Sequence, residues 1–216
     1  DGQPHALLTI QSLSVIPKVG HLTAETKNGD LRYGLFDCVP EGCVFVMNVV
    51  IEHQIDVKQH IKRIRKSCAG GNIESFAARE QCDESLVEME YGNDLFPVAM
   101  GIYIKGKDKE TLHNKIDNVE SLLTNNGFSL IDPEIELAPC DAYLRFLPMA
   151  FDYKFDKSKG IRRARYVFAR QIANLLPFYG RNRGTGNPCF LRWNRGGEPF
   201  CFDPFSKRDK SANSHM

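Results

Sequence analysis

The strongest constraint on the fold is a run of alternating residues in the middle of this 216-residue chain. Residues 98–105 alternate between two classes of side chain, Val98, Met100, Ile102 and Ile104 against Ala99, Gly101, Tyr103 and Lys105. This period of two predicts a strand with one strongly apolar face. A turn follows at residues 106–108, where Asp108 is placed to cap a helix.

The segment after Asp108 completes a strand–helix–strand unit. Apolar residues recur at helical spacing from Leu112 to Leu123, and Gly127 supplies a left-handed stop. Residues 128–131 then predict the next strand. The unit therefore places a helix on one face of a sheet.

A similar pattern precedes this unit. Residues 43–51 are rich in β-branched side chains and predict a buried strand, and a helix is predicted to begin near Asp56 and to end at Gly70 and Gly71. A further helix is predicted over residues 73–91, and short strands over 6–10 and 32–36. We expect an α+β fold, with a mixed or antiparallel sheet, helices packed on it and ferredoxin-like strand–helix–strand units, followed by a C-terminal helix and a β-hairpin.

The charge of the chain divides it into two regions. Residues 153–216 carry 14 basic and 4 acidic residues, whereas residues 1–152 carry 14 basic and 23 acidic ones. We therefore expect an α+β N-terminal domain over 1–152 and a basic linking region over 153–216. Such asymmetry indicates either an anionic partner or an electrostatic complement elsewhere in the same protein.

Residues 158–176 predict a basic amphipathic helix, with apolar residues on one side and arginines mostly on the other. It could contact an anionic membrane surface or nucleic acid, although a core-packed helix with a solvated basic face explains the pattern as well. Aromatic residues among the later arginines keep binding of single-stranded nucleic acid open. The candidate contact residues are Arg162, Arg163, Arg165, Arg170, Arg181, Arg183, Arg192 and Arg195.

Motifs for catalysis are absent or weak. The phosphate-loop pattern G-x-x-x-x-G-K-[ST] does not occur, and the glycine-rich residues 180–186 lack its lysine. We expect His53 and His60 to be satisfied or solvent-exposed rather than metal ligands, and the carboxylates Glu84, Glu88, Glu90 and Asp94 to form a solvated face. A thiol enzyme using Cys82, Asp83 and Glu84 with His113 is a weak alternative. We predict no catalytic, cofactor-binding or metal-binding residue in this chain.

The composition argues against membrane spanning and secretion. The longest apolar run, residues 43–51, is far shorter than the roughly 20 residues that a spanning helix needs. The first residues lack the features of a secretory signal, and seven cysteines without a Cys-x-x-Cys pair make a disulfide framework improbable. A reducing cytoplasm is the simplest location.

The last 28 residues carry a resemblance to a known family. Residues 189–193 and 200–202 predict a hairpin whose turn contains Gly196, Gly197 and Pro199, and Asp203-Pro204-Phe205 and Asn213 with His215 follow. This order is similar to the segment just before the phosphate-binding loop in conjugative-transfer ATPases of the TraC and TrbE type, the motors of type IV secretion. We expect the chain to be the N-terminal region of such a motor, cut before its ATPase domain.

The resemblance implies a function for the chain and for its parent protein. The parent would be a hexamer-forming cytoplasmic ATPase docked at the bacterial inner membrane, binding ATP and Mg²⁺ through the domain that would follow, and this chain would supply docking to inner-membrane components of the secretion channel. Apolar surface around residues 189–202 would be covered by the ATPase domain. The alternative is a stand-alone nucleic-acid-binding module that uses the basic C-terminal third.

Overall fold

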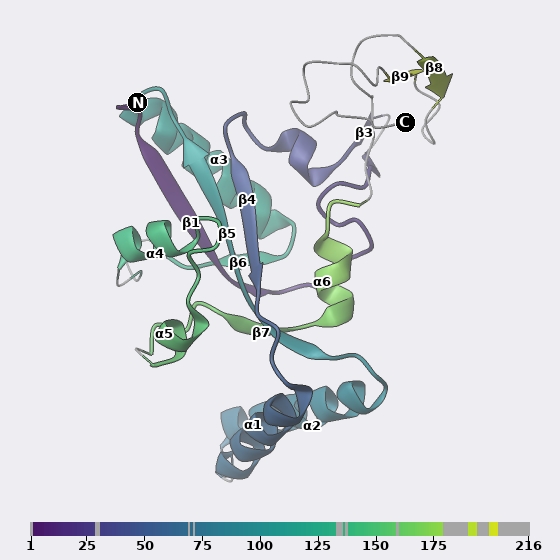
Figure 1. Ribbon diagram of the computed structural model, residues 1–216, viewed down its shortest axis with the longest axis vertical. Coiled ribbons are helices and arrows are strands. Elements are labelled where there is room, and N and C mark those ends of the chain that lie inside the picture. Colours follow the sequence, from purple (N-terminus) through teal and green to yellow (C-terminus); the bar gives the residue numbers. More distant parts are fainter. Residues whose placement is uncertain are drawn as a thin grey trace. The chain divides into compact units, whose positions relative to one another are not determined.

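A five-stranded antiparallel sheet organises the larger part of the chain. The computed structural model describes residues 2–28, 31–68, 70, 72–132, 136, 138–158, 160–178, 190–193 and 199–202. The sheet contains β1 (His5–Leu13), β4 (Val44–Val49), β5 (Leu95–Lys105), β6 (Phe128–Leu130) and β7 (Arg165–Phe168) in the order β4-β5-β1-β6, with β7 also on β5 (Figure 1). The expected α+β class is confirmed.

Strand β5 lies at the centre of the sheet. One edge pairs with β4, from Val44 opposite Tyr103 to Val49 opposite Val98. The other edge pairs first with β7 over Leu95–Val98 and then with β1 over Met100–Lys105. The alternating run at residues 98–105 thus lies in the central strand, which pairs with three of the other four strands.

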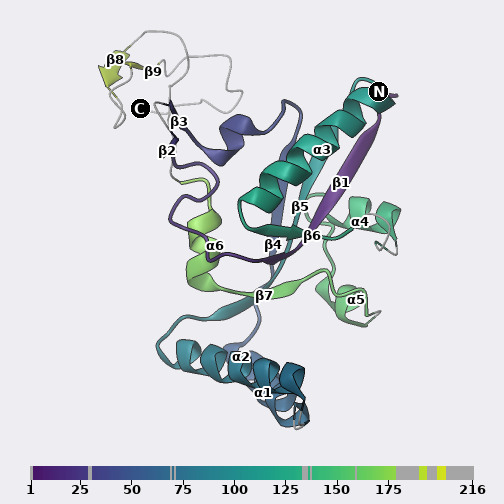
Figure 2. The same cartoon turned by 180° about the vertical axis from the view of Figure 1, so that it is seen from behind.

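Helix α3 (Lys109–Asn125) covers one face of the sheet (Figure 2). Its start is as predicted, since the Asp108 side chain accepts a hydrogen bond from the Thr111 N–H at 2.7 Å. Its end is also confirmed, because Gly127 adopts a φ of 85°. The core beneath the helix consists of buried apolar side chains from β1, β5, β6 and α3 itself, including Leu8, Ile10, Met100, Ile102, Ile104, Val119, Leu123 and Phe128.

The opposite face carries α4 (Pro139–Arg145) and α5 (Tyr153–Ser158) (Figure 1). Phe146, which is fully buried, packs directly over Gly101: a Cβ atom at this glycine would lie 3.1 Å from the Phe146 ring. The small residue in β5 therefore permits the close approach of the segment that follows α4.

Helices α1 (Gln54–Ser67) and α2 (Ile73–Glu90) confirm two predicted helices but not their expected position. They form a helical hairpin between β4 and β5, beyond the end of the sheet, so α1 contacts that end and does not cover a face of the sheet (Figure 1). Of the two expected strand–helix–strand units, β5-α3-β6 is present, with β1 inserted between its parallel strands. The apolar face of α1 is buried against α2 and the end of the sheet, where Val57, Ile61 and Met89 form one cluster with Leu95 of β5.

The prediction of one continuous basic helix over residues 158–176 is wrong. The structure has the end of α5, a loop, strand β7 and a short helix α6 (Ala169–Leu175). Gly160 and Arg162 both adopt positive φ values, which no helix tolerates, and the Asp156 carboxylate accepts hydrogen bonds from the N–H groups of Arg163 and Ala164. Residues 165–168 are then recruited as a strand because β5 offers them an unpaired edge.

Strand β4 is confirmed, but the prediction that it is buried is wrong. Its two ends, Val44 and Val49, are exposed and its centre is half-buried. The reason is its place in the sheet: within the described residues β4 pairs only with β5, so it is an edge strand.

The contacts divide the chain into two units, residues 1–18 with 39–175 and residues 19–38 with 176–216. This division differs from the boundary expected at residue 152, since residues 153–175 contribute α5, β7 and α6 to the first unit. The second unit contains β2 (Thr26–Asn28) paired with β3 (Leu31–Tyr33), a 3-10 helix (Leu35–Cys38), and the predicted hairpin of β8 (Phe190–Trp193) and β9 (Pro199–Phe202). The strand predicted over 32–36 thus ends at Tyr33. In the described part of the chain, no helix combines the length and apolar character needed to cross a membrane.

Candidate docking site

An apolar cavity of about 310 Å³ lies on the α4 face of the sheet. Strands β1, β4 and β5 supply its floor, and α4 with the residues after it supplies a wall. The lining residues are His5, Gly42, Val44, Val46, Tyr103, Ile104, Lys105, Tyr143, Leu147 and Pro148. The cavity belongs entirely to the first unit.

The register of the sheet explains why these side chains meet. Val44 lies opposite Tyr103, so the two side chains share a face, and Val46 lies on the same face two residues along. The Tyr103 hydroxyl donates a hydrogen bond to the main-chain oxygen of Tyr143, and the two rings stack edge to face at 4.9 Å. Tyr103 therefore ties α4 to the sheet and holds the cavity open beside β4.

The rim of the cavity is accessible and carries no acid among its lining residues. Val44 is 57% exposed and Leu147 is 39% exposed, although both are aliphatic. The charged or titratable lining groups are His5, Lys105 and the two tyrosines. An apolar cavity with a basic edge fits an apolar anchor side chain of another protein better than a polar substrate.

Tyr103 lines the cavity with a phenol whose pKa is shifted. Burial, and then the neighbouring Tyr143, raise the pKa of Tyr103 to about 12, so its hydroxyl stays neutral at physiological pH. No thiol or carboxylate stands among the lining residues, and no group of three candidate metal ligands occurs anywhere in the described residues.

Strand β4 adds an open sheet edge beside the cavity. In the described part of the chain, its only strand partner is β5. The side-chain nitrogen of Asn48 is buried without a hydrogen-bond partner. An edge strand next to an apolar cavity is the arrangement that accepts an extended segment of another protein, with main-chain hydrogen bonds on the edge and an anchor residue in the cavity.

The predicted arginine contacts that the structure describes lie on several different elements. Arg162, Arg165 and Arg170 are exposed, but they lie on a loop, a strand and a short helix. Arg192 is exposed on β8, whereas Arg181, Arg183 and Arg195 lie outside the described residues. Binding of an anionic partner stays a prediction, without the continuous basic helix on which it was based.

Arg163 was expected on a solvated face, but it is 2% exposed. Its guanidinium donates hydrogen bonds to Asp141 at 2.8 Å, to Glu136 at 3.0 Å and to the main-chain oxygen of Ala138 at 3.1 Å. Burial opposes its charge, but these partners outweigh that cost and raise the pKa of Arg163. The side chain thus fixes the start of α4 and, through it, the wall of the cavity.

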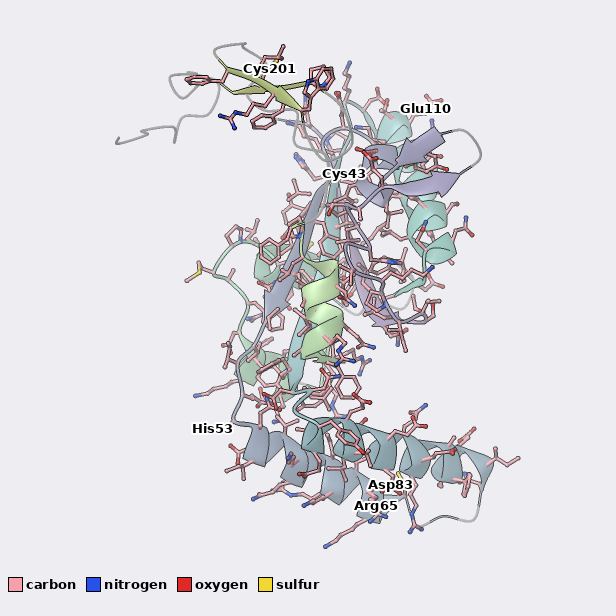
Figure 3. The ribbon with its side chains drawn as sticks, turned by 90° about the vertical axis from the view of Figure 1, so that its right-hand side faces the viewer. Cys43, His53, Arg65, Asp83, Glu110 and Cys201 are labelled. Atoms are coloured by element: carbon pink, nitrogen blue, oxygen red, sulfur yellow. The ribbon has the colours of Figure 1, made fainter. Side chains whose placement is uncertain are left out.

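The weaker catalytic candidates are not assembled into a site. Cys82 lies on α2, whereas His113 lies on α3. Asp83 forms an ion pair with Arg65 across the helical hairpin (Figure 3). Burial raises the pKa of the Cys82 thiol, which is the opposite of what a nucleophile needs. Burial also raises the pKa of Cys43.

The remaining candidates are mostly exposed, but Asp94, which was expected on the solvated face, is half-buried. His53 is exposed, His60 is half-buried with its ring 5.8 Å from that of Tyr166, and Glu84, Glu88 and Glu90 are exposed. The residues that sequence reasoning missed are those of the cavity. An aliphatic pair at alternating positions, Val44 and Val46, was visible, but nothing local showed that Tyr143 and Leu147 would lie across from them.

These features describe an α+β protein built on an antiparallel sheet. The sequence model of one family, described as TraC protein, matches residues 1–151. The chain therefore belongs to the TraC family, which links it to conjugative transfer. Among curated proteins, none matches the sequence at a significant level.

Proposed function

We propose that this chain is a non-catalytic docking and assembly region of a motor ATPase that energises conjugative DNA transfer through a type IV secretion system. The observation that carries the docking role is the accessible apolar cavity beside the open edge of β4. The family match supports the link to conjugative transfer. The absence of a phosphate-loop motif from the sequence supports a non-catalytic role for the chain itself.

The proposed occupant of the cavity is an apolar segment of an inner-membrane component of the secretion channel. A component with a juxtamembrane apolar segment would present an aliphatic or aromatic anchor, and an acidic flank would complement His5 and Lys105 at the rim. The parent protein would then be cytoplasmic and peripheral to the inner membrane.

The C-terminal hairpin supports a second contact, with the parent's own ATPase domain. Phe190, Leu191 and Trp193 are all exposed on β8, whose strand partner among the described residues is β9. We propose that the ATPase domain, which would bind ATP and Mg²⁺ and form the hexamer, covers this apolar surface.

Charged substitutions in the cavity test the docking role in donor cells that carry the full-length protein. Val44→Asp and Leu147→Asp place a carboxylate at exposed lining positions, so folding should survive. We expect both variants to lose membrane association and to reduce conjugative transfer at least ~10-fold, as truncation of a central anchor does. Val49→Asp is the matched control, because Val49 is also exposed on β4 but does not line the cavity.

Two results would contradict the proposal. Normal membrane association and transfer in both cavity variants would show that the cavity is not a docking site. Equal losses in the Val49→Asp control would show that the strand as a whole, rather than the cavity, is sensitive to charge.

A further inference from the structure

Helix α2 carries two apolar stripes on opposite faces. Ala78, Cys82, Leu86 and Met89 are half-buried or buried and face α1. The opposite stripe contains exposed apolar residues at the same helical spacing, Ile73, Phe76, Val87 and, just after the helix, Tyr91. Phe76 is 70% exposed and Tyr91 is 83% exposed. A surface helix of a globular protein normally has one apolar face, which packs on the core. The second apolar stripe of α2 therefore indicates a binding partner.

The charges of the hairpin are segregated between its two helices. Helix α1 carries five basic residues and one acid, whereas α2 carries six acids and one arginine. Some of these charges pair inside the hairpin, as in Lys58 with Glu90 at 3.0 Å and Arg65 with Asp83. Those on the outer faces do not: in the described structure, Lys62 and Lys66 of α1 and Glu80 and Glu84 of α2 have no ion-pair partner.

The unpaired charges lie on surfaces that complement each other. Glu80 and Glu84 fall within the exposed apolar stripe of α2, between Phe76 and Val87. Lys62 and Lys66 lie on the outer face of α1 together with the exposed Ile55. Lysine stems can cover apolar side chains while their amines reach carboxylates, so the outer face of α1 suits the outer face of α2.

The base of the hairpin is tied firmly to the sheet. The Gln54 side chain makes two hydrogen bonds to the main chain of Leu95, donating to its oxygen at 3.0 Å and accepting from its N–H at 3.1 Å. Glu52 accepts a hydrogen bond from the Tyr166 hydroxyl at 3.2 Å. These contacts hold both outer faces in a fixed orientation, which lowers the entropic cost of docking another molecule.

We propose that the helical hairpin is a self-association element, in which the outer face of α2 in one copy docks on the outer face of α1 in the next. The outer face of α2 is acidic and apolar, and the outer face of α1 is basic. Since both faces belong to one hairpin, a second copy of the chain supplies the surface that complements each of them. Because the two faces differ, the contact is heterologous and generates a ring or an open chain of copies. This contact is separate from the cavity and does not rest on the docking function.

Reciprocal charge reversal tests this arrangement, with sedimentation velocity of the 216-residue chain as the readout. One variant carries Lys62→Glu with Lys66→Glu, and a second carries Glu80→Lys with Glu84→Lys. We expect the unmodified chain to associate as its concentration rises and each variant to stay monomeric, because each would face like charges. An equimolar mixture of the two variants should associate again, as should a chain that carries all four reversals.

Controls separate this contact from nonspecific charge effects. Asp117→Lys with Glu120→Lys reverses two exposed acids on α3 and should leave association unchanged. Phe76→Ser should weaken association whether it is added to the wild-type chain or to the two mixed variants. In each case it removes an apolar side chain from the α2 face of the contact. Circular dichroism of each variant confirms that the helices are intact.

Three outcomes would overturn the proposal. A chain that stays monomeric at all concentrations has no self-association element. Loss of association with the α2 reversal but not with the α1 reversal would show that two α2 faces meet each other. Failure of both the mixture and the four-fold variant to associate, with the helices intact, would show that charge complementarity between the two faces does not drive the contact.

Discussion

Replacing Arg163 by methionine should destabilise the first unit strongly. The change keeps most of the side-chain volume but removes a buried guanidinium that contacts Glu136 and Asp141. Breaking a fully buried ion pair costs about 3–5 kcal/mol, because the remaining charge is left without a partner. Glu136 is 12% exposed, whereas Asp141 is 32% exposed and keeps Arg145 at 2.8 Å, so we expect a smaller cost of about 2–4 kcal/mol.

Urea unfolding followed by far-ultraviolet circular dichroism measures this cost. Arg145→Met is the matched comparison, since Arg145 also pairs with Asp141 and lies over the Phe155 ring at 3.7 Å, yet is more exposed. We expect it to cost about 1 kcal/mol or less.

Neutralising the two acids tests the cause of the destabilisation. Adding Glu136→Gln and Asp141→Asn to Arg163→Met should recover at least half of the lost stability, because no buried charge is then left unpaired. A cost of Arg163→Met no larger than that of Arg145→Met would refute the reasoning. Failure of the two neutral substitutions to recover any stability would do the same.

Three further predictions concern the same unit. Lowering the pH should remove the stabilisation that Asp141 contributes, because hydrogen bonds from Arg163 hold its folded pKa below the ordinary 3.8. This stabilisation is present above pH 3.8 and is lost as the pH falls through the folded pKa. The difference in unfolding free energy between the wild type and Asp141→Asn should shrink in that range, and a constant difference would argue against the linkage. Gln54→Ala should cost about 1–3 kcal/mol by leaving the Leu95 main chain unsatisfied, visible as faster amide exchange at Leu95. Gly106→Ala should lower the free energy of unfolding in urea by at least about 1–3 kcal/mol, since a Cβ would lie 2.7 Å from the main-chain nitrogen of Leu112. Lys107→Ala, at the exposed neighbouring position, should change it very little.

The elements that the sequence predicted correctly are those whose signal is local. Strand β5 has a period of two, α3 has a cap at Asp108 and a glycine stop at Gly127, and the C-terminal hairpin has its turn residues between two aromatic runs. Each of these signals depends only on neighbours in the chain, so tertiary contacts did not overrule it.

The segment from 158 to 176 was mispredicted because a tertiary partner overruled its helical period. Its apolar residues do recur at helical spacing, but Gly160 interrupts the run, and Arg-Tyr-Val-Phe at 165–168 has strand-forming residues. What decides the outcome is the free edge of β5 at Leu95–Val98, a feature 70 residues away. A local pattern contains no information about such an edge.

The cavity and the buried arginine escaped prediction for the same reason. Val44 and Tyr143 are separated by about a hundred residues in sequence, and only the strand register and the packing of α4 bring them together. In the sequence, Arg163 is indistinguishable from the arginines beside it. Only the fold brings Glu136 and Asp141 to its guanidinium. By contrast, the family resemblance rested on ordered motifs after residue 189, and the match over residues 1–151, which does not include those motifs, confirms the family.

The docking account is tested most directly by photocrosslinking from the cavity in donor cells. A photoreactive phenylalanine analogue at position 44 of the full-length protein should crosslink to an inner-membrane component of the secretion channel, and the same analogue at position 49 should not. Crosslinks from position 44 that reach only the protein's own ATPase domain, or that match those from position 49, would contradict the claim that the cavity docks the motor to the channel.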